Sequence, residues 1–370
     1  MCIQITIPEV ENKKNKGNLS LPVDLIRTIG IVLVVMLHVS NEYYTIIYQT
    51  PLESAGFWWT ATVYKSLTLS CIPLFIMLSG ALLLQPFKIN EPITVFLRKR
   101  ANRIGLAFAF WSAVYIAWGF FVNQIPVTFY NVVEGTAKSL FTGPWYHFWF
   151  LYLIAGLYLI TPVLRAVVAY RAQNLLRYLI ILWFLGVAVV PFLQLITGYS
   201  LSSGVFVFGG WIGYFVLGTY LQNKRLRSSI LYGLFLLGLF WTISSTWYMH
   251  FFANSLEQDY FFFDYLTANV IVASIALFMI LSRFNADWPG SNNPRLSRVV
   301  RAISENTLPI YLFHVIILES LQKGYFGFKL SLTIINPVIG VPLITTVTFF
   351  ITFGLVLLMK KIPLLKNLIG

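Results

Sequence analysis

Residues 178–223 read YLIILWFLGVAVVPFLQLITGYSLSSGVFVFGGWIGYFVLGTYLQN, and no charged residue occurs between Arg177 and Lys224. This stretch is long enough to cross a bilayer twice, because one spanning helix needs about 20 mostly apolar residues. The polar and glycine residues of 197–204, TGYSLSSG, indicate a turn between the two crossings. In lipid only helices and closed barrels satisfy their own backbone, and the stretch lacks the alternation of a barrel strand. It therefore predicts two membrane-spanning helices.

The rest of the chain has the same character. It is 58% hydrophobic and only 11% charged, whereas a typical soluble domain is about 25% charged. We predict an all-α, polytopic transmembrane helical bundle of about ten spans, at residues 21–43, 66–86, 104–123, 145–164, 178–197, 204–222, 229–250, 265–282, 302–320 and 333–359. Asn336-Pro337 predicts that the last span is kinked or begins late. One transmembrane domain, 21–360, then lies between a polar N-terminal tail, 1–20, and a short C-terminal tail, 361–370.

The positive charges are distributed unevenly between the two sides of this arrangement. All but four of the 26 Lys and Arg residues fall on the side of the two termini, and the four on the other side are Lys65, Lys138, Lys323 and Lys329. Because cytoplasmic segments carry the excess of Lys and Arg, both termini are predicted to be cytoplasmic. This distribution accounts for the net charge of +13 without a nucleic-acid partner. The basic segments would also attract anionic membrane lipids.

The two cysteines, Cys2 and Cys71, provide neither a disulfide framework nor the spacing of a metal site. Cys71 falls inside an apolar run, which predicts a packed thiol. No short apolar stretch with a small-residue cleavage site follows the polar N-terminus, so we expect the first apolar segment to be retained.

The first span contains unexpected charges. Only 14 residues separate Arg27 from Glu42, too few to cross a bilayer, so Asp24 and Arg27 must belong to the helix. Arg27 and His38 are eleven residues apart, which places them on one helix face about 16 Å apart. Asp24 is spaced to pair with Arg27. This pattern predicts a pocket with a positive mouth and a deeper imidazole; alternatively, the charges cap the helix end and His38 is structural.

A basic cluster opens the third span at Arg98, Lys99, Arg100 and Arg103. Arg100 and Arg103 are one turn apart and share a helix face. Such a pair can bind phosphate through forked hydrogen bonds. The alternative is a plain positively charged anchor at the membrane surface, and the charges alone do not decide between the two.

Two further stretches carry histidines. Residues 143–150, GPWYHFWF, place His147 and Trp149 at an outer helix end, where aromatic residues are also expected as an interfacial belt. Residues 304–314, SENTLPIYLFH, carry Glu305, Tyr311 and His314 into the ninth span. His314 is predicted to be either a second functional imidazole or a helix–helix hydrogen-bonding residue.

Five of these segments together resemble the acyltransferase 3 family of membrane acyltransferases. They are residues 24–27, DLIR, followed by His38; residues 71–80, CIPLFIMLSG; residues 100–103, RANR; residues 149–152, WFLY; and residues 310–314, IYLFH. They run in family order from about residue 22 to 315. Each segment alone is weakly specific, whereas the ordered set is specific.

The resemblance implies an O-acyltransferase that moves an acyl group, commonly acetyl, from cytoplasmic acyl-CoA to a hydroxyl of an extracytoplasmic or lipid-linked carbohydrate. It implies the stand-alone type, in a plasma membrane, with acyl-CoA as a substrate and no permanently bound cofactor. His38 would act as general base or become acylated, with Arg27 and Asp24 orienting the site. Phosphates of the donor would meet Arg100 and Arg103, with Arg98 or Lys99. The remaining candidates for the acceptor side or for support of the histidine are His314, Tyr311, Glu305, Trp149 and His147.

Two other functions remain open from the sequence. A transporter or flippase for a lipid-linked sugar would also have many spans and buried charges, but transporter folds often show inverted repeats, and we find none here. A non-catalytic scaffold or sensor would leave Arg27, His38 and His314 without a purpose, in spite of the cost of inserting them in a membrane.

Overall fold

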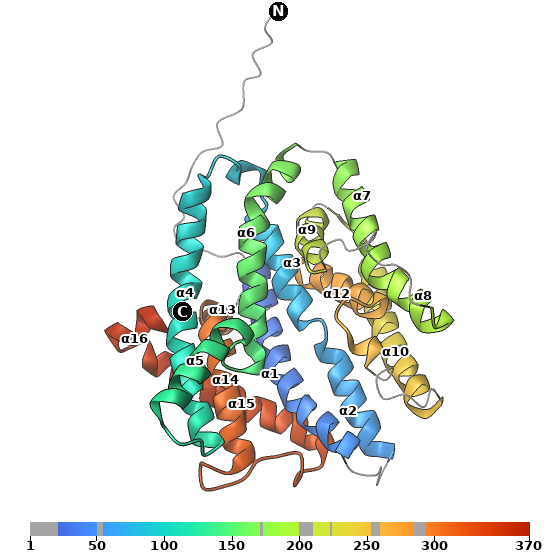
Figure 1. Cartoon of the computed structure of the whole chain (residues 1–370). Helices are drawn as coiled ribbons and strands as arrows, with labels where there is room; N and C mark the ends of the chain where they lie inside the picture. The colour runs from blue at the N-terminus through green and yellow to red at the C-terminus, as the bar shows by residue number, and fades with distance from the viewer. Residues whose placement is uncertain are drawn as a thin grey trace, which may run out of the picture.

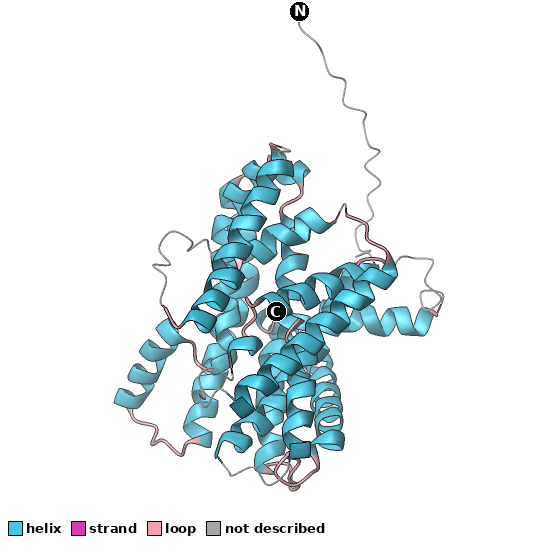
Figure 2. Cartoon of the chain, turned by 90° about the vertical axis from the view of Figure 1, so that its right-hand side faces the viewer, coloured by secondary structure: helices cyan, strands magenta, loops and turns pink. Residues whose placement is uncertain are grey.

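The computed structural model describes residues 21–49, 55–170, 173–199, 210–222, 224–252, 260–284 and 293–370, and these residues form helices and their connections (Figures 1 and 2). The α-helices are α1 (Leu21–Gln49), α2 (Ala55–Thr68), α3 (Cys71–Leu83), α4 (Ile93–Val122), α5 (Phe129–Thr142), α6 (Trp149–Ala169), α7 (Gln173–Phe184), α8 (Val190–Thr197), α9 (Ile212–Leu221), α10 (Ser228–Phe252), α12 (Ala268–Leu281), α13 (Pro294–Glu305), α14 (Thr307–Lys323), α15 (Pro337–Met359) and α16 (Pro363–Leu368). Shorter segments are η1 (Pro86–Lys88), η2 (Tyr146–Phe148), the π-helical η3 (Leu185–Val189) and η5 (Phe261–Phe263). The predicted all-helical class is confirmed.

Eight helical segments of the described residues are long and apolar enough to cross a membrane. They are Pro22–Glu42, Trp58–Leu83, Ile93–Val122, Phe129–Ala169, Gln173–Thr197, Ser228–Phe252, Phe261–Leu281 and Pro337–Met359. The two other predicted spans, 204–222 and 302–320, correspond to the shorter helices α9 and α14. The protein is therefore a multi-pass membrane protein, and about ten spans fit its helices.

Several helix boundaries differ from those predicted from hydropathy. The second span begins at α2 and is broken at Leu69 and Ser70 before α3. The third begins at Ile93, so its basic cluster lies within the opening turns of α4. The ninth is divided at Asn306 between α13 and α14. Hydropathy missed these points because a helix can continue beyond the lipid, and because a break inside lipid depends on partners from other helices.

The two ends of the bundle carry different sets of polar and charged residues. At one end Asp24 accepts from Ser304 at 2.6 Å and Arg283 donates to Ser228 at 2.8 Å. We call this end, together with Arg103, Arg165 and Lys224, the basic face. At the other end Glu42 accepts from Ser331 at 2.6 Å and Glu319 accepts from Trp118 at 2.7 Å; this is the opposite face. Figure 1 shows α4 and α6 extending beside α1 and α3.

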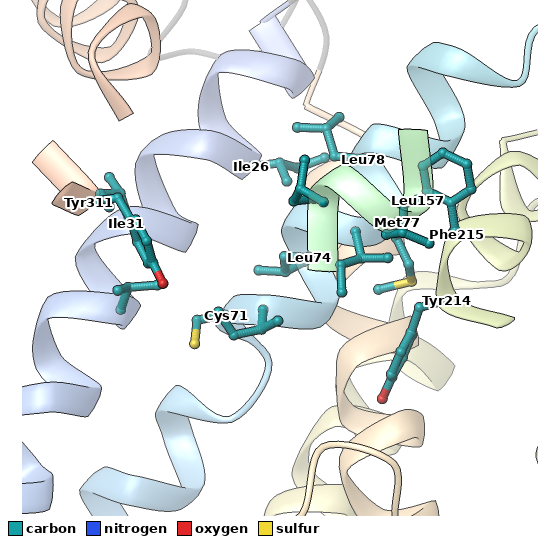
Figure 3. Close-up of a cluster of buried hydrophobic side chains, with 14 of the residues drawn as sticks. Ile26, Ile31, Cys71, Leu74, Met77, Leu78, Leu157, Tyr214, Phe215 and Tyr311 are labelled. Atoms are coloured by element: carbon teal, nitrogen blue, oxygen red, sulfur yellow. The ribbon is translucent and has the colours of Figure 1, made fainter. Parts of the chain in front are cut away.

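Helix α3 lies at the centre of the core (Figure 3). It packs so closely on α9 that a Cβ at Gly80 would lie 1.7 Å from the carbonyl oxygen of Phe215, and one at Gly218 would lie 1.9 Å from that of Met77. Small residues allow such backbone approach between helices in membranes. Cys71, at the start of α3, is a free, buried thiol, as predicted from its apolar surroundings.

The C-terminal segment 361–370 is folded against the bundle rather than extended as a tail. It contains α16, and the side chain of Ile369 is fully buried. The indole nitrogen of Trp111 in α4 donates to the carbonyl oxygen of Ile369 at 3.3 Å. Pro337 opens α15, so the predicted late start of the last span is confirmed.

Candidate active site

Three histidines from distant parts of the chain lie together. His38 comes from α1, His147 from η2 and His314 from α14. The ring centroids of His38 and His314 are 5.1 Å apart, and those of His147 and His314 are 5.9 Å apart. The structure therefore brings together three residues that the sequence could only consider one at a time.

The hydrogen bonding of His314 determines where its proton lies. Its Nδ1 atom is 2.7 Å from the carbonyl oxygen of Tyr311. Because a carbonyl oxygen can only accept, Nδ1 carries the hydrogen, and in the neutral ring Nε2 keeps a lone pair. Nε2 is buried and has no hydrogen-bond partner among the described residues. His314 thus presents an unused proton acceptor within the cluster.

Access distinguishes the three imidazoles. His147 and His314 are fully buried, whereas His38 is partly exposed. The Tyr146 ring lies 5.3 Å from the His38 ring, and Tyr146 is 55% exposed. His38 is therefore the least buried of the three imidazoles.

Tyrosine hydroxyls link α14 to η2 and to α4. Tyr311 of α14 donates to the carbonyl oxygen of His147, and Tyr115 of α4 donates to the carbonyl oxygen of Leu312 at 2.7 Å. Gly143, at φ +84°, permits the turn that leads into η2. Because both hydroxyl hydrogens are engaged with backbone oxygens, these tyrosines position the histidines.

Trp149 and Glu305 lie apart from the histidines. Trp149 packs against Trp211 and Tyr265, with ring centroids 5.6 Å and 6.3 Å away. Glu305 accepts from Arg301 at 2.9 Å on the basic face. Of the candidates for the acceptor side, the structure places His147, Tyr311 and His314 at the cluster.

The basic end of α1 is attached to α13. Ser304 donates to Asp24, and Thr28 donates to the carbonyl oxygen of Val300 at 3.0 Å. Asp24 forms no salt bridge within 4.0 Å among the described residues. Arg27 nevertheless lies within electrostatic range of Asp24, and also of Arg103 in α4. The helix face shared by Arg27 and His38 thus runs from the basic face to the histidine cluster.

The four basic residues that open α4 have different surroundings. Lys99 pairs with Glu91 at 2.9 Å, and Arg98 is exposed. Arg100 lies over the rings of Phe96 and Tyr158. Arg103 lies within electrostatic range of Arg27 and Lys360. Arg103 therefore adjoins the α1 face that leads to His38, and Tyr158 lies within electrostatic range of the same Arg27.

A cavity of about 930 Å³ opens on the basic face between α1, α3, α9, α10 and α12. Its basic lining residues are Lys224, Arg225, Arg227 and Arg283, and its apolar wall includes Ile26 of α1. No acidic side chain is among the described residues that line it. The sequence indicates only on which side of the membrane these cations lie, because nothing local to them predicts a cavity.

A comparison with known protein families gives a match for this chain. The family model described as an acyltransferase domain matches residues 22–359. The chain belongs to the acyltransferase 3 family. No curated protein and no solved structure matches the chain.

This acyltransferase 3 protein is accordingly a membrane acyltransferase. Its five motif segments lie in α1, α3, α4, α6 and α14. The described residues contain no group of three His, Cys, Asp or Glu side chains arranged to hold a metal ion. The chemistry that can be derived from its side chains is acid–base or nucleophilic catalysis by an imidazole.

Glu91, on the basic face, makes the stability of the acyltransferase depend on pH. Hydrogen bonds from Lys99 and then Arg165 hold the pKa of Glu91 below its ordinary value. A lowered folded-state pKa contributes stability that is complete above the unfolded pKa, about 4.3, and is lost as pH falls through the folded value. We expect unfolding midpoints from pH 6 to 3 to fall less steeply for Glu91→Gln than for the wild type. Parallel curves for the two proteins would contradict this.

Proposed function

We propose that this acyltransferase moves an acyl group, with acetyl as the expected case, from cytoplasmic acyl-CoA to a hydroxyl of an extracytoplasmic or lipid-linked carbohydrate. The observation that carries the proposal is the partly exposed imidazole of His38 beside the free Nε2 lone pair of His314. The basic end of α1 lies about 16 Å from His38 along the helix. In this arrangement the basic face is cytoplasmic and the membrane is the plasma membrane.

In the direct mechanism His38 takes the proton of the acceptor hydroxyl as the oxygen attacks the thioester carbonyl. The new ester bond forms, the carbon–sulfur bond breaks, and the CoA thiolate leaves with the proton that His38 had taken. His314, whose tautomer is held by Tyr311, accepts a hydrogen bond at Nε2 and orients the His38 ring. In the covalent mechanism His38 attacks the thioester itself, the carbon–sulfur bond breaks, and CoA leaves as the thiolate. The acceptor hydroxyl then attacks the acyl–imidazole, the acyl–nitrogen bond breaks, and the hydroxyl proton passes to the released imidazole.

CoA is too polar to enter lipid, so its phosphates must remain on the basic face while the thioester reaches inward. Two sets of cations there could bind them. One is Arg103 beside Arg27, with Arg100 one turn before it. The other is the set that lines the 930 Å³ cavity, a volume within the range of ligand pockets. Arginine is suited to both because its planar fork matches phosphate oxygens.

Calorimetric titration of the purified protein with acetyl-CoA tests the donor and separates the two sets of cations. We expect the affinity to fall about tenfold to 100-fold in Arg100→Ala/Arg103→Ala, because a hydrogen bond to a charged group is worth about 1.5–3 kcal/mol. The same titration of Arg225→Ala/Arg227→Ala measures how much the cations that line the cavity contribute to this affinity. Arg295→Ala/Arg298→Ala, on α13 outside both sets, removes the same charge and is expected to leave the affinity unchanged.

Three results would contradict parts of the proposal. Folded wild-type protein that binds no acetyl-CoA would exclude this donor. Equal losses in all three double variants would mean that the cations act only through net charge. In membrane vesicles, acetyl-CoA added from outside should be consumed only when the basic face points outward, and consumption in vesicles of the reverse orientation would overturn the assigned sidedness.

A further inference from the structure

Glu319, near the end of α14 on the opposite face, is held by two indoles. Its Oε2 accepts from Nε1 of Trp118 at 2.7 Å, and its Oε1 accepts from Nε1 of Trp145 at 2.8 Å. Trp118 comes from α4, and Trp145 directly precedes η2. Among the described residues no cation lies within 4.0 Å of Glu319. The Glu319 carboxylate is therefore held by two neutral donors, one on each oxygen.

This arrangement leaves acceptor capacity unused. An ionised carboxylate offers about four acceptor positions on its two oxygens, and the indoles occupy two of them. The Glu319 side chain is partly exposed, so the other positions can be reached from open space. A carboxylate without a cation is costly within a membrane protein, and by default it marks a functional site.

Aromatic rings surround this carboxylate. The Trp118 ring lies 6.0 Å from the ring of Tyr325, which is 45% exposed, and the Trp145 ring lies 5.7 Å from that of Tyr115. An interfacial belt would also place aromatic residues at this depth. A belt does not require two indole N–H groups from separate segments to converge on one acidic residue. The surface thus combines apolar ring faces with hydrogen-bond acceptors.

The same surface adjoins the histidine cluster. Tyr146 follows Trp145 in the chain, and its ring lies 5.3 Å from that of His38. His38, Tyr146 and Glu319 are all partly or largely exposed. A molecule that contacted Glu319 and the indoles would therefore have a neighbouring group next to His38.

We propose that Glu319, Trp118 and Trp145 form the subsite that binds the sugar ring of the acceptor. Hydroxyl groups of the sugar donate to the free positions of the Glu319 carboxylate, and its C–H faces pack on the aromatic rings. Glu319 contributes to specificity and does not touch the reacting atoms. This inference rests on the proposed function and adds to it the residues that select a polyhydroxylated acceptor.

A matched pair of acceptors tests the subsite in the full-length protein in lipid nanodiscs. Octyl β-D-glucoside and 1-octanol have the same alkyl chain, and only the first carries a sugar. With acetyl-CoA as donor, we expect the wild type to have the higher kcat/KM for the glucoside. Glu319→Gln, which keeps the size of the side chain but removes its charge, should lower the glucoside-to-octanol ratio by about tenfold to 100-fold, mainly through the KM for the glucoside.

Glu134→Gln, at an exposed acidic residue of α5, is the matched control and should leave the ratio unchanged. If Glu319→Gln does not fold, Trp118→Phe and Trp145→Phe remove one N–H donor each and keep an aromatic ring. A wild type without preference for the glucoside would overturn the subsite, and so would variants in which both acceptors lose the same factor. Failure of the proposed function looks different: folded protein then acetylates neither acceptor and releases no thiol from acetyl-CoA.

Discussion

Replacing His38 by alanine is expected to lower the rate of acyl transfer by about 10²- to 10⁴-fold, the range that one positioned general base contributes. His38 is the partly exposed imidazole of the cluster, whereas His147 and His314 are fully buried. Neither of the other two rings can replace it, because both are fully buried. The measurement is the initial rate of thiol release from acetyl-CoA in the presence of an acceptor alcohol.

His250→Ala is the matched control for this loss. His250 stacks on Trp58, with ring centroids 5.0 Å apart, at the end of α10 and outside the cluster. Its replacement removes an imidazole from the same protein. Because this imidazole lies outside the cluster, we expect the rate to change by less than about twofold. If the two variants were equally active, His38 could not be the base or the nucleophile.

The same variant separates the two mechanisms. In the covalent mechanism, wild-type protein that is incubated with labelled acetyl-CoA and no acceptor retains label on His38. In the direct mechanism no label is retained, although the rate still depends on His38. Label that persisted in His38→Ala would place the acyl group on another residue and would contradict the covalent role of His38.

The spans could be predicted from the sequence because each one depends only on its own residues. A helix in lipid must satisfy its own backbone hydrogen bonds, so an apolar run such as residues 178–197 is sufficient to predict a helix. Breaks within lipid depend on other helices and left no local signal. Ser70 interrupts the second span where its hydroxyl meets Ser274, 204 residues away, at 3.1 Å. The packing of Ile369 against α4 has the same origin.

The candidate site was only partly predictable for a similar reason. The spacing of Arg27 and His38 on one helix defines a face without any tertiary information. The sequence could not decide whether His314 was functional, because that depends on the free Nε2 atom beside α1. The sequence did not single out Glu319, since its indole partners lie 201 and 174 residues away. It also did not predict the hydrogen bond from Ser304 to Asp24, which forms because α13 packs against α1.

The position of the site within the bundle follows from what has to cross the membrane. Arg27 and Arg103 are at the basic face, whereas Glu319 and Trp118 are at the opposite face. His38 lies between them on α1. In the proposed reaction the charged parts of the donor and the sugar never share one compartment; only the uncharged acyl group passes, and it needs no aqueous channel.

The contact between α3 and α9 is where we expect the largest effect on stability. Gly80→Ala would place a Cβ 1.7 Å from the carbonyl oxygen of Phe215, so the two helices must move apart. The separation also weakens the hydrogen bond from Thr219 to the carbonyl oxygen of Gly80, now 2.8 Å. Overpacking and the lost hydrogen bond together predict a loss of about 3 kcal/mol or more in the free energy of unfolding.

Gly233→Ala distinguishes this steric effect from a general effect of replacing glycine in a helix. Gly233 lies in α10, and a Cβ there would have nothing within 4 Å. Alanine favours a helix by up to about 1 kcal/mol over glycine, so this variant should be as stable as the wild type or slightly more stable. Thermal unfolding in detergent, followed by size-exclusion chromatography, compares the midpoints. Equal midpoints for Gly80→Ala and Gly233→Ala would contradict the backbone contact between α3 and α9.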